Sequence, residues 1–222
     1  MQTKVDIEIV TGFLGAGKTY FINTLIKETY LSFERVLIIQ NEKGMTSIED
    51  TILHSKNINL EFCEPSSNIS ADYIKTMIEK YKPQRIIIEY NGTKNLVQLV
   101  EIISQELSKA CKLASVFYLA DILSYEMFFS NMPTLILPCI YHSNLIVLNN
   151  CSKVSKDKLK IIKTNINKLN KNTFIADIES LDFLEKELQY MAILDGGILK
   201  FLRIATKLLF SKIGNKATRK EY

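Results

Sequence analysis

Two patterns of hydrophobic and polar positions alternate along the chain. Short apolar runs rich in β-branched residues are separated by longer segments whose apolar residues recur at helical spacing. The predicted strands cover residues 5–10, 36–40, 85–89, 114–120, 145–148 and 173–175. Because such alternation is typical of βα units that feed a parallel sheet, it predicts a three-layer α/β/α domain with a mostly parallel sheet.

The predicted helices lie between and after these strands. One begins near residue 18 and has apolar residues at positions 21, 22, 25 and 26, and another covers residues 73–81 behind an N-cap at Ser70. Further helices are predicted near residues 94–109, 155–169 and 181–194, the last ended by Gly196 and Gly197. Sheets of this kind bind ligands at the loops that leave the carboxyl ends of their strands. Chemistry is therefore expected directly after each strand.

The loop after the first predicted strand reads VTGFLGAGKTY and has the spacing of a phosphate-binding P-loop. Glycines let successive backbone N–H groups turn toward a phosphate, and the start of the next helix adds its positive dipole end. Lys18 is expected to contact the β- and γ-phosphates, and the Thr19 hydroxyl to bind Mg²⁺. The alternative is a glycine-rich turn with a solvated lysine. The predicted nucleotide-binding residues are Gly12, Gly15, Ala16, Gly17, Lys18, Thr19, Tyr20 and Asn149.

Acidic residues stand at the carboxyl ends of two further predicted strands, Glu42 after residues 36–40 and Glu89 at the end of residues 85–89. Glu89 ends the strand at 85–89, where a P-loop enzyme needs a carboxylate to hold a magnesium-bound water or to orient the attacking water. Gly92 follows three residues later and is expected to offer its N–H to the γ-phosphate. Lys18, Glu89 and Gly92 are the predicted catalytic residues, while Thr19, Glu89 and Glu42 are the predicted ligands of Mg²⁺ or a nearby metal. Taken singly, Glu89 and Gly92 would be ordinary turn residues.

The loop LNNCS at residues 148–152 follows the fifth predicted strand. Asn149 is predicted to contact the nucleotide base or to order the loop. A competing interpretation makes Ser152 or Ser155 the N-cap of the lysine-rich helix that follows. Both interpretations stay open at the level of the sequence.

Composition and charge place the chain in a broad class. Its 222 residues are 47% apolar, which suffices for one soluble domain with its own core. Residues 1–150 hold 13 basic and 16 acidic side chains and residues 151–222 hold 15 and 8, so the two parts carry −3 and +7. The basic end either faces a polyanion or is a solvated surface, and nothing resembles a nucleic-acid-binding module.

Cysteine usage and the N-terminal residues predict a cytoplasmic protein. The cysteines at 63, 111, 139 and 151 form no C-x-x-C pair, MQTKVDIEIV lacks the apolar core of a signal peptide, and no apolar run is long enough to cross a bilayer. The chain is expected to divide into a nucleotide-binding domain at 1–195 and an amphipathic helix with a basic tail at 196–222. Burial of that helix on the sheet or a second protomer competes with docking on a membrane or partner.

These motifs together resemble the CobW/HypB/UreG-type P-loop GTPases, and within them the CobW-like branch. TGFLGAGKT matches the phosphate loop of that branch, Asn41-Glu42-x-Gly44 its N-E-F-G element and Glu89-x-x-Gly92 its E-T-x-G element. Asp121 stands at the V-D-A element and LNNCS at the L-N-K-x-D base loop, so the resemblance spans about residues 5–175. It implies Mg²⁺-dependent binding and hydrolysis of GTP, and slow turnover is expected because the sequence shows no obvious arginine finger beside the P-loop. It also implies delivery of zinc, cobalt or nickel to a client metalloprotein or cofactor enzyme. A homodimer is a separate expectation, since the apolar C-terminal helix could pack on a second protomer.

Three departures from the family pattern modify this picture. Ser152 replaces the guanine-reading Asp and Asn150 the usual Lys, and a hydroxyl cannot reproduce the fork in which a carboxylate accepts two hydrogen bonds from guanine. Of the C-x-C-C metal triplet only Cys63 remains, and one thiolate is not a tetrahedral zinc site. Cys63 is either part of a weaker site, completed by Glu42, Glu61, Glu64 or His54, or a small buried apolar residue. The family's C-terminal domain has no counterpart, so a truncated member is expected.

Three functions are compatible with these motifs. The first is a GTP-dependent switch of the metal-chaperone type. The second is a nucleotide-binding regulatory or assembly module that does not hydrolyse its ligand, which the eroded base and metal motifs would favour. The third is a small-molecule kinase on the same scaffold, against which the sequence shows no arginine-rich lid.

Overall fold

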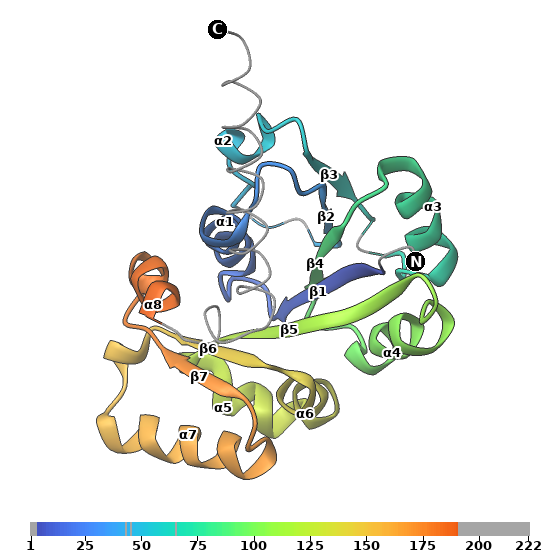
Figure 1. Ribbon diagram of the computed structural model, residues 1–222. Coiled ribbons are helices and arrows are strands. Elements are labelled where there is room, and N and C mark those ends of the chain that lie inside the picture. The colour runs from blue at the N-terminus through green and yellow to red at the C-terminus, as the bar shows by residue number, and fades with distance from the viewer. Residues whose placement is uncertain (1–3, 43, 45, 65, 191–222) are drawn as a thin grey trace, which may run out of the picture.

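The computed structural model describes residues 4–42, 44, 46–64 and 66–190, which form a single sheet covered on both faces by helices (Figure 1). The sheet has seven strands in the order β3-β2-β4-β1-β5-β6-β7. Every strand pair is parallel, so the predicted three-layer α/β fold is confirmed. The strands are β1 Val5–Gly12, β2 Val36–Gln40, β3 Ile58–Phe62, β4 Arg85–Asn91, β5 Cys111–Asp121, β6 Leu145–Asn149 and β7 Phe174–Asp177.

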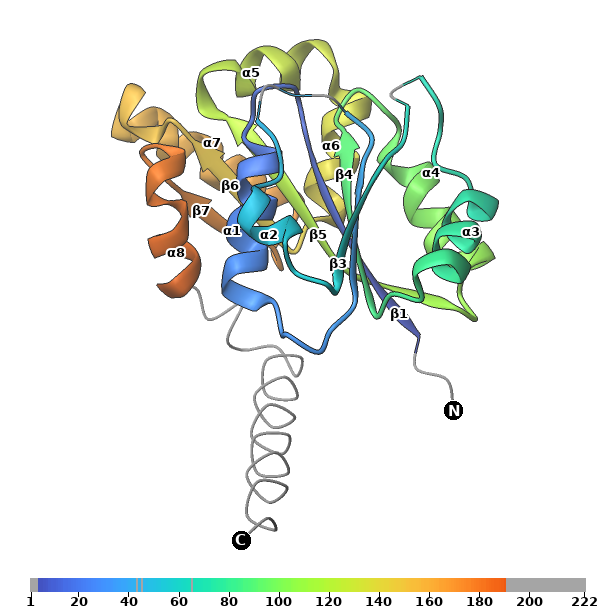
Figure 2. The same cartoon turned by 90° about the horizontal axis from the view of Figure 1, so that it is seen from above.

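The helices separate into two layers, one on each face of the sheet (Figure 2). Apolar side chains of α1, α2 and α8 pack into one core cluster, and those of α3 to α7 pack into the other. Both faces of the inner strands are therefore buried, which explains the continuous apolar runs in β2, β4 and β6. The helices are α1 Lys18–Thr29, α2 Asp50–Leu53, α3 Ala71–Tyr81, α4 Leu96–Glu101, α5 Ile122–Asn131, α6 Pro133–His142, α7 Lys156–Leu169 and α8 Leu184–Tyr190.

Several predicted elements need correction. The sequence pattern missed β3, because this edge strand is only five residues long and Ile58 is its single buried residue. It also missed α5 and α6, where Pro133 begins α6 and Pro138 lies inside it. The helix predicted at 94–109 is α4 followed by a π-helical turn, Ile102–Glu106, and the helix predicted at 181–194 begins as a 3₁₀ turn at Leu181–Phe183. Residues 191–222, including the predicted amphipathic helix, lie outside the described residues.

A buried ion pair joins the central strands beneath the loops that carry the site. Arg85 at the start of β4 is 1% exposed, and its Nη2 lies 2.6 Å from Oε2 of Glu8 in β1. Its Nη1 donates to the Thr29 hydroxyl at the end of α1, over 2.9 Å. This group therefore fixes two strands and one helix relative to one another.

The cysteines and the lengths of the helices bear on the prediction that the protein is cytoplasmic. Cys63, Cys111, Cys139 and Cys151 are all buried and free. Within the described ranges, none of the helices has the length and apolar character needed to cross a membrane. The predicted cytoplasmic location stays a prediction.

Candidate nucleotide-binding site

The phosphate loop lies between β1 and α1, as its sequence predicts. Gly12, Gly15 and Gly17 all have positive φ angles, of 148°, 80° and 98°. A methyl group on Gly12 would stand 2.2 Å from the carbonyl oxygen of Leu119 in β5, so only glycine fits there. Gly17 is the N-cap of α1 and supplies no side chain to cap the helix, which leaves the first N–H groups of α1 available for an anion.

The loop is held against α5 by aromatic stacking. The rings of Phe13 and Phe128 lie 4.0 Å apart at an angle of 9°. Beside them, between the phosphate loop and α5, is a cavity of about 270 Å³. Leu14 at the tip of the loop is exposed. The loop conformation is therefore supported by packing as well as by its glycines.

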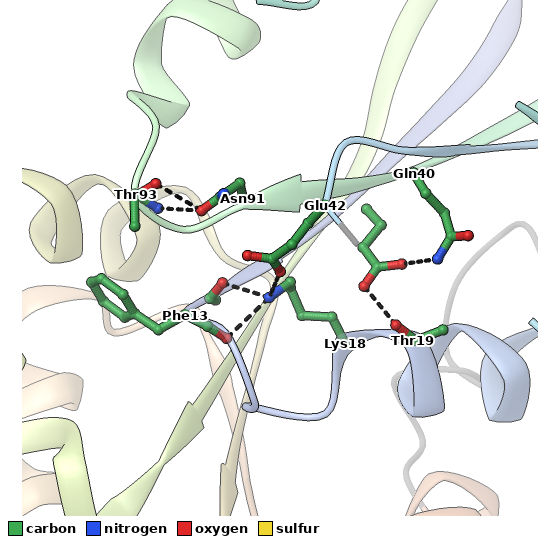
Figure 3. A network of polar contacts seen from close by, with 9 residues as sticks. Phe13, Lys18, Thr19, Gln40, Glu42, Asn91 and Thr93 are labelled. Atoms are coloured by element: carbon green, nitrogen blue, oxygen red, sulfur yellow. Dashed lines mark hydrogen bonds and ion pairs between the residues drawn. The ribbon is translucent and has the colours of Figure 1, made fainter. Parts of the chain in front are cut away.

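Lys18 begins α1 and turns back into the loop (Figure 3). Its side chain is 3% exposed. Nζ donates to the carbonyl oxygens of Gly12 and Phe13 over 2.8 and 3.0 Å, and it lies 2.5 Å from Oε2 of Glu42. The ammonium group is thus placed at the mouth of the phosphate loop by the loop itself.

Thr19 and Glu89 meet from opposite sides of the site. The Thr19 hydroxyl donates to Oε1 of Glu89 over 2.7 Å, and Nε2 of Gln40 donates to Oε2 over 2.6 Å (Figure 3). Glu89 is 2% exposed, and burial raises the pKa of its carboxyl, an effect opposed by these hydrogen bonds and by the charge of Lys18. A buried carboxylate beside a hydroxyl is a set of hard oxygen donors, which fits a Mg²⁺ ion.

Gly92 packs directly on the phosphate loop. A methyl group there would lie 2.5 Å from the carbonyl carbon and oxygen of Gly12, and the Gly92 N–H donates to that oxygen over 3.1 Å. In this structure the N–H predicted to sense a γ-phosphate therefore bonds to the loop. Asn91, the last residue of β4, shapes this turn by accepting hydrogen bonds from the backbone and side chain of Thr93.

Asn41 connects the site to the loop that follows β3. It is fully buried, and its Nδ2 donates to the carbonyl oxygens of Cys63, Glu64 and Ser67 over 3.3, 3.1 and 3.3 Å. Its backbone N–H donates to the carbonyl oxygen of Glu89 over 3.0 Å. Asn41 therefore fixes the end of β2 to the loop after β3 and to strand β4.

The residues considered for a metal site at Cys63 are not gathered into one cluster in this structure. Burial raises the pKa of the Cys63 thiol, and the nearby Lys94 ammonium only partly opposes this shift, so the neutral thiol is favoured. Glu61 bonds to Lys80 and Tyr81, and His54 bonds to the carbonyl oxygen of Asp50. In the part of the chain that the structure describes, no three His, Cys, Asp or Glu side chains are grouped so that they could hold a metal ion. The role of Cys63 stays a prediction.

The base loop follows β6 and lies against the end of β7. Asn149 is buried, and its Oδ1 accepts the N–H of Asn150, whose φ is 63°. The Ser152 hydroxyl donates to the carbonyl oxygen of Glu179 over 3.4 Å. Ser155 caps α7 by accepting the N–H of Lys158, which settles the question of the N-cap in favour of Ser155.

Two further motif residues have structural contacts. Tyr20 is partly buried and packs against the core cluster that contains α1. Asp121 caps α5, its Oδ1 accepting the N–H of Leu123 over 3.0 Å. Sequence reasoning missed Gln40, which the pairing of β2 with β4 sets beside Glu89, and Asn91, whose side chain shapes the turn after β4. Their positions at strand ends were the available signal.

Comparison with known proteins places this geometry in a family. A model described as the nucleotide-binding domain of CobW/HypB/UreG matches residues 6–177. The chain is 24% identical over 181 residues to the zinc-regulated GTPase metalloprotein activator 1 of Schizosaccharomyces pombe, a match covering 75% of this chain and 44% of that protein. It is 30% identical over 106 residues to the zinc chaperone CobW of Sinorhizobium sp, covering 41% and 29%. The chain therefore spans less than half the length of these two relatives.

Solved structures agree in fold. Zn(II)-bound YjiA GTPase from E. coli superposes with a TM-score of 0.58 at 19% identity, covering 86% of this chain and 64% of that one. HypB from Helicobacter pylori in complex with nickel gives a TM-score of 0.51 at 14% identity, covering 84% and 86%. The family model covers most of the chain and runs from β1 through β7. The chain thus belongs to the CobW/HypB/UreG nucleotide-binding domain family, as its motifs predict.

Proposed function

We propose that this protein is a Mg²⁺-dependent GTP-binding protein that hydrolyses GTP slowly and works as a switch in metal delivery or cofactor assembly. The observation that carries the proposal is the convergence of Lys18, Thr19 and Glu89 at the end of β1, where the first N–H groups of α1 are available. These are the group types that phosphoryl transfer to water requires, namely a cation, an anion-binding helix terminus and oxygen ligands for magnesium.

Each residue has a separate task in this proposal. Lys18 and the start of α1 bind the β- and γ-phosphates, while Thr19 and Glu89 hold Mg²⁺. The ion would supply neutralising charge to the phosphates. The Gly92 N–H, which donates to the Gly12 carbonyl oxygen in this structure, lies close enough to the loop to donate to the γ-phosphate instead. Catalysis then consists of positioning and charge stabilisation, without a covalent intermediate.

Slow hydrolysis is supported by the positions of the arginines. Within the described residues these are Arg35 and Arg85. Arg85 is buried in its ion pair with Glu8, and Arg35 donates through Nε to the carbonyl oxygen of Lys82. Neither is available to neutralise charge on a transferring phosphoryl group, and such an arginine accelerates hydrolysis by about 10³ to 10⁵.

A phosphate-release assay tests the proposal. We expect slow release of phosphate from GTP that requires Mg²⁺, stops on addition of EDTA and is absent in Lys18→Ala. A control on the same helix is Lys27→Ala, because Lys27 forms an exposed ion pair with Glu49 away from the loop. If the purified protein neither binds nor cleaves any nucleoside triphosphate, the proposal is wrong.

Metal delivery rests on kinship. The two curated relatives are named as a zinc-regulated activator and a zinc chaperone, and the chain matches only part of each. We propose a zinc, cobalt or nickel ion as cargo, with Cys63 and Glu42 among its ligands, and a metalloprotein or cofactor enzyme as client. Elemental analysis of protein purified without chelators tests this, and unchanged metal content in Cys63→Ser would exclude Cys63.

One observation favours a second candidate, a nucleotide-binding module without hydrolysis. The Ser152 hydroxyl is directed to a backbone carbonyl, and no carboxylate stands at this position to read guanine. Calorimetric titration with GTP, ATP and GDP, combined with the phosphate-release assay, separates the two candidates. Tight binding without release would favour the module.

A further inference from the structure

The hydrogen-bonding capacity of Lys18 is fully used in this structure. An ammonium group has three N–H donors and no acceptor. Nζ has three oxygen partners, the carbonyls of Gly12 and Phe13 at 2.8 and 3.0 Å and Oε2 of Glu42 at 2.5 Å. A phosphate oxygen can bind Lys18 only by replacing one of these partners.

Glu42 is the partner that can leave. The two carbonyl groups belong to the phosphate loop, whose conformation is fixed by Gly12 against Leu119 and by the stacking of Phe13 on Phe128. Glu42 lies in the connection between β2 and α2, beyond the last strand residue, Gln40. Its carboxylate resembles a phosphate in charge and in hydrogen-bond acceptors (Figure 3).

We propose that Glu42 is an internal counter-ion that holds the phosphate-binding position of Lys18 and is displaced by the phosphates of an incoming nucleotide. This inference rests on the proposed nucleotide binding at the phosphate loop. It gives Glu42 a function different from that of a metal ligand, namely to set the affinity for nucleotide and to move when nucleotide binds.

The electrostatics of the site determine where the displaced carboxylate can go. The side chains of Lys18 and Glu42 are 3% and 9% exposed, so their ion pair is nearly free of solvent screening. Once the phosphates have taken its place on Lys18, the Glu42 carboxylate would face those phosphates and the buried carboxylate of Glu89. Like charges repel strongly at low dielectric. The carboxylate must therefore move to solvent or to a cation.

Asn41 defines where this movement begins. Its side-chain Nδ2 donates hydrogen bonds to the carbonyl oxygens of Cys63, Glu64 and Ser67, and its backbone N–H donates to the carbonyl oxygen of Glu89. These four hydrogen bonds keep the end of β2 in place when Glu42 leaves Lys18. The change is thereby confined to the connection that follows Asn41.

The experiment measures nucleotide affinity in EDTA, so that any role of Glu42 as a metal ligand is removed. Binding of a fluorescent GDP and of a fluorescent GTP is titrated with the wild type and with Glu42→Gln. Because the variant leaves Lys18 without its counter-ion in the free protein, we expect dissociation constants about tenfold lower than those of the wild type. Association should also be faster.

Glu49→Gln is the matched control. Glu49 stands at the end of the same connection, loses the same charge on substitution, and pairs with Lys27 at 2.7 Å, but this pair is exposed. Its dissociation constants should be those of the wild type within about twofold, since exposed pairs are screened. Glu42→Asp, which keeps the charge but withdraws it by one methylene group, should lie between the wild type and Glu42→Gln.

The outcomes separate two failures. If the wild type binds no nucleotide with or without Mg²⁺, the proposed function fails. If the wild type binds in EDTA, while Glu42→Gln and Glu42→Asp keep the wild-type thermal midpoint and bind equally or more weakly, the counter-ion role is refuted and nucleotide binding stands. Should Glu42→Gln not fold, the same comparison is made with Glu42→Asp alone.

Discussion

At the scale of single residues, the site depends on backbone segments that approach too closely for any side chain. Gly12 touches β5 and Gly92 touches Gly12, so three strand ends meet without intervening side chains. This contact brings the backbone N–H groups and the buried Glu89 near the same point. The phosphate loop is therefore sensitive to substitutions that leave its charged residues intact.

Substitution of the loop glycines tests this sensitivity. Gly15→Ala should lower the free energy of unfolding by about 1 to 2 kcal/mol, because its φ is 80° but nothing lies within 4 Å of the added methyl. Gly12→Ala should cost more, since its methyl would also meet Leu119 oxygen at 2.2 Å. Urea unfolding measures both. Equal stability of the two variants would show that the close contact with β5 is unimportant.

Thr19 and Thr24 form a second pair of contrasting residues, both on α1. Thr19 bonds to Glu89, whereas the Thr24 hydroxyl donates to the Tyr20 carbonyl oxygen over 3.0 Å. In Mg²⁺, Thr19→Val should weaken GTP binding about tenfold, and in EDTA it should change little, because its hydroxyl acts through the ion. Thr24→Val should change neither. A loss by Thr19→Val of the same size in EDTA would contradict a magnesium role.

At the scale of elements, the pairing of strands decides which side chains share the site. Gln40 is the register partner of Glu89, and the carboxylate is therefore held from β2 as well as from α1. Two residues beyond Gln40, Glu42 reaches Lys18 at the phosphate loop. Residues from two strand ends and one helix start thus form one hydrogen-bonded group.

The buried ion pair beneath the site gives a prediction at this scale. Arg85→Met should lower the free energy of unfolding by about 3 to 5 kcal/mol, because it leaves Glu8 buried without its partner. Replacing Glu8 by Met as well should recover much of this loss. Lys112→Met, which removes a half-exposed pair with Asp6, should cost less than about 1 kcal/mol. The account of this pair would be wrong if Arg85→Met and Lys112→Met were equally stable in urea.

Sequence reasoning recovered the elements whose local signal is strong. The strands β2 and β4 contain continuous apolar runs, and β1 has apolar residues at positions 5, 7, 9 and 10. Ser70 and Ser155 cap helices as their positions indicate. The edge strand β3 was missed because it is short and only Ile58 in it is buried, and the proline-containing α6 because proline usually ends a helix. The phosphate loop was visible in its spacing. The contacts of Glu42 and Gln40 were not, since they arise from strand register and side-chain direction.

At the scale of the whole molecule, the sheet order separates the phosphate end of the site from the base end. β1 is central, with the Glu89 strand on one side and the strands before the base loop on the other. A nucleotide can therefore have its phosphates recognised by well-matched residues while its base meets an altered loop. Affinity and base preference are separable properties of this protein.

The separation of phosphate binding from base recognition can be tested by comparing the affinities for GTP and ATP. We expect the wild type to bind GTP and ATP within about tenfold of one another, since the single oxygen of Ser152 cannot reproduce the two-oxygen fork by which a carboxylate binds guanine. Ser152→Asp should tighten GTP binding about tenfold without tightening ATP binding. Ser155→Asp is the control, because Asp at an N-cap preserves α7. Strong preference of the wild type for GTP would show that other groups read the base.

Calorimetric titration of the wild-type protein with GTP in the presence of Mg²⁺ tests the central claim most directly. The account predicts saturable binding at one site, which is lost in Lys18→Ala and retained in Lys27→Ala. Absence of binding in the folded wild type, or unchanged binding in Lys18→Ala, would contradict it.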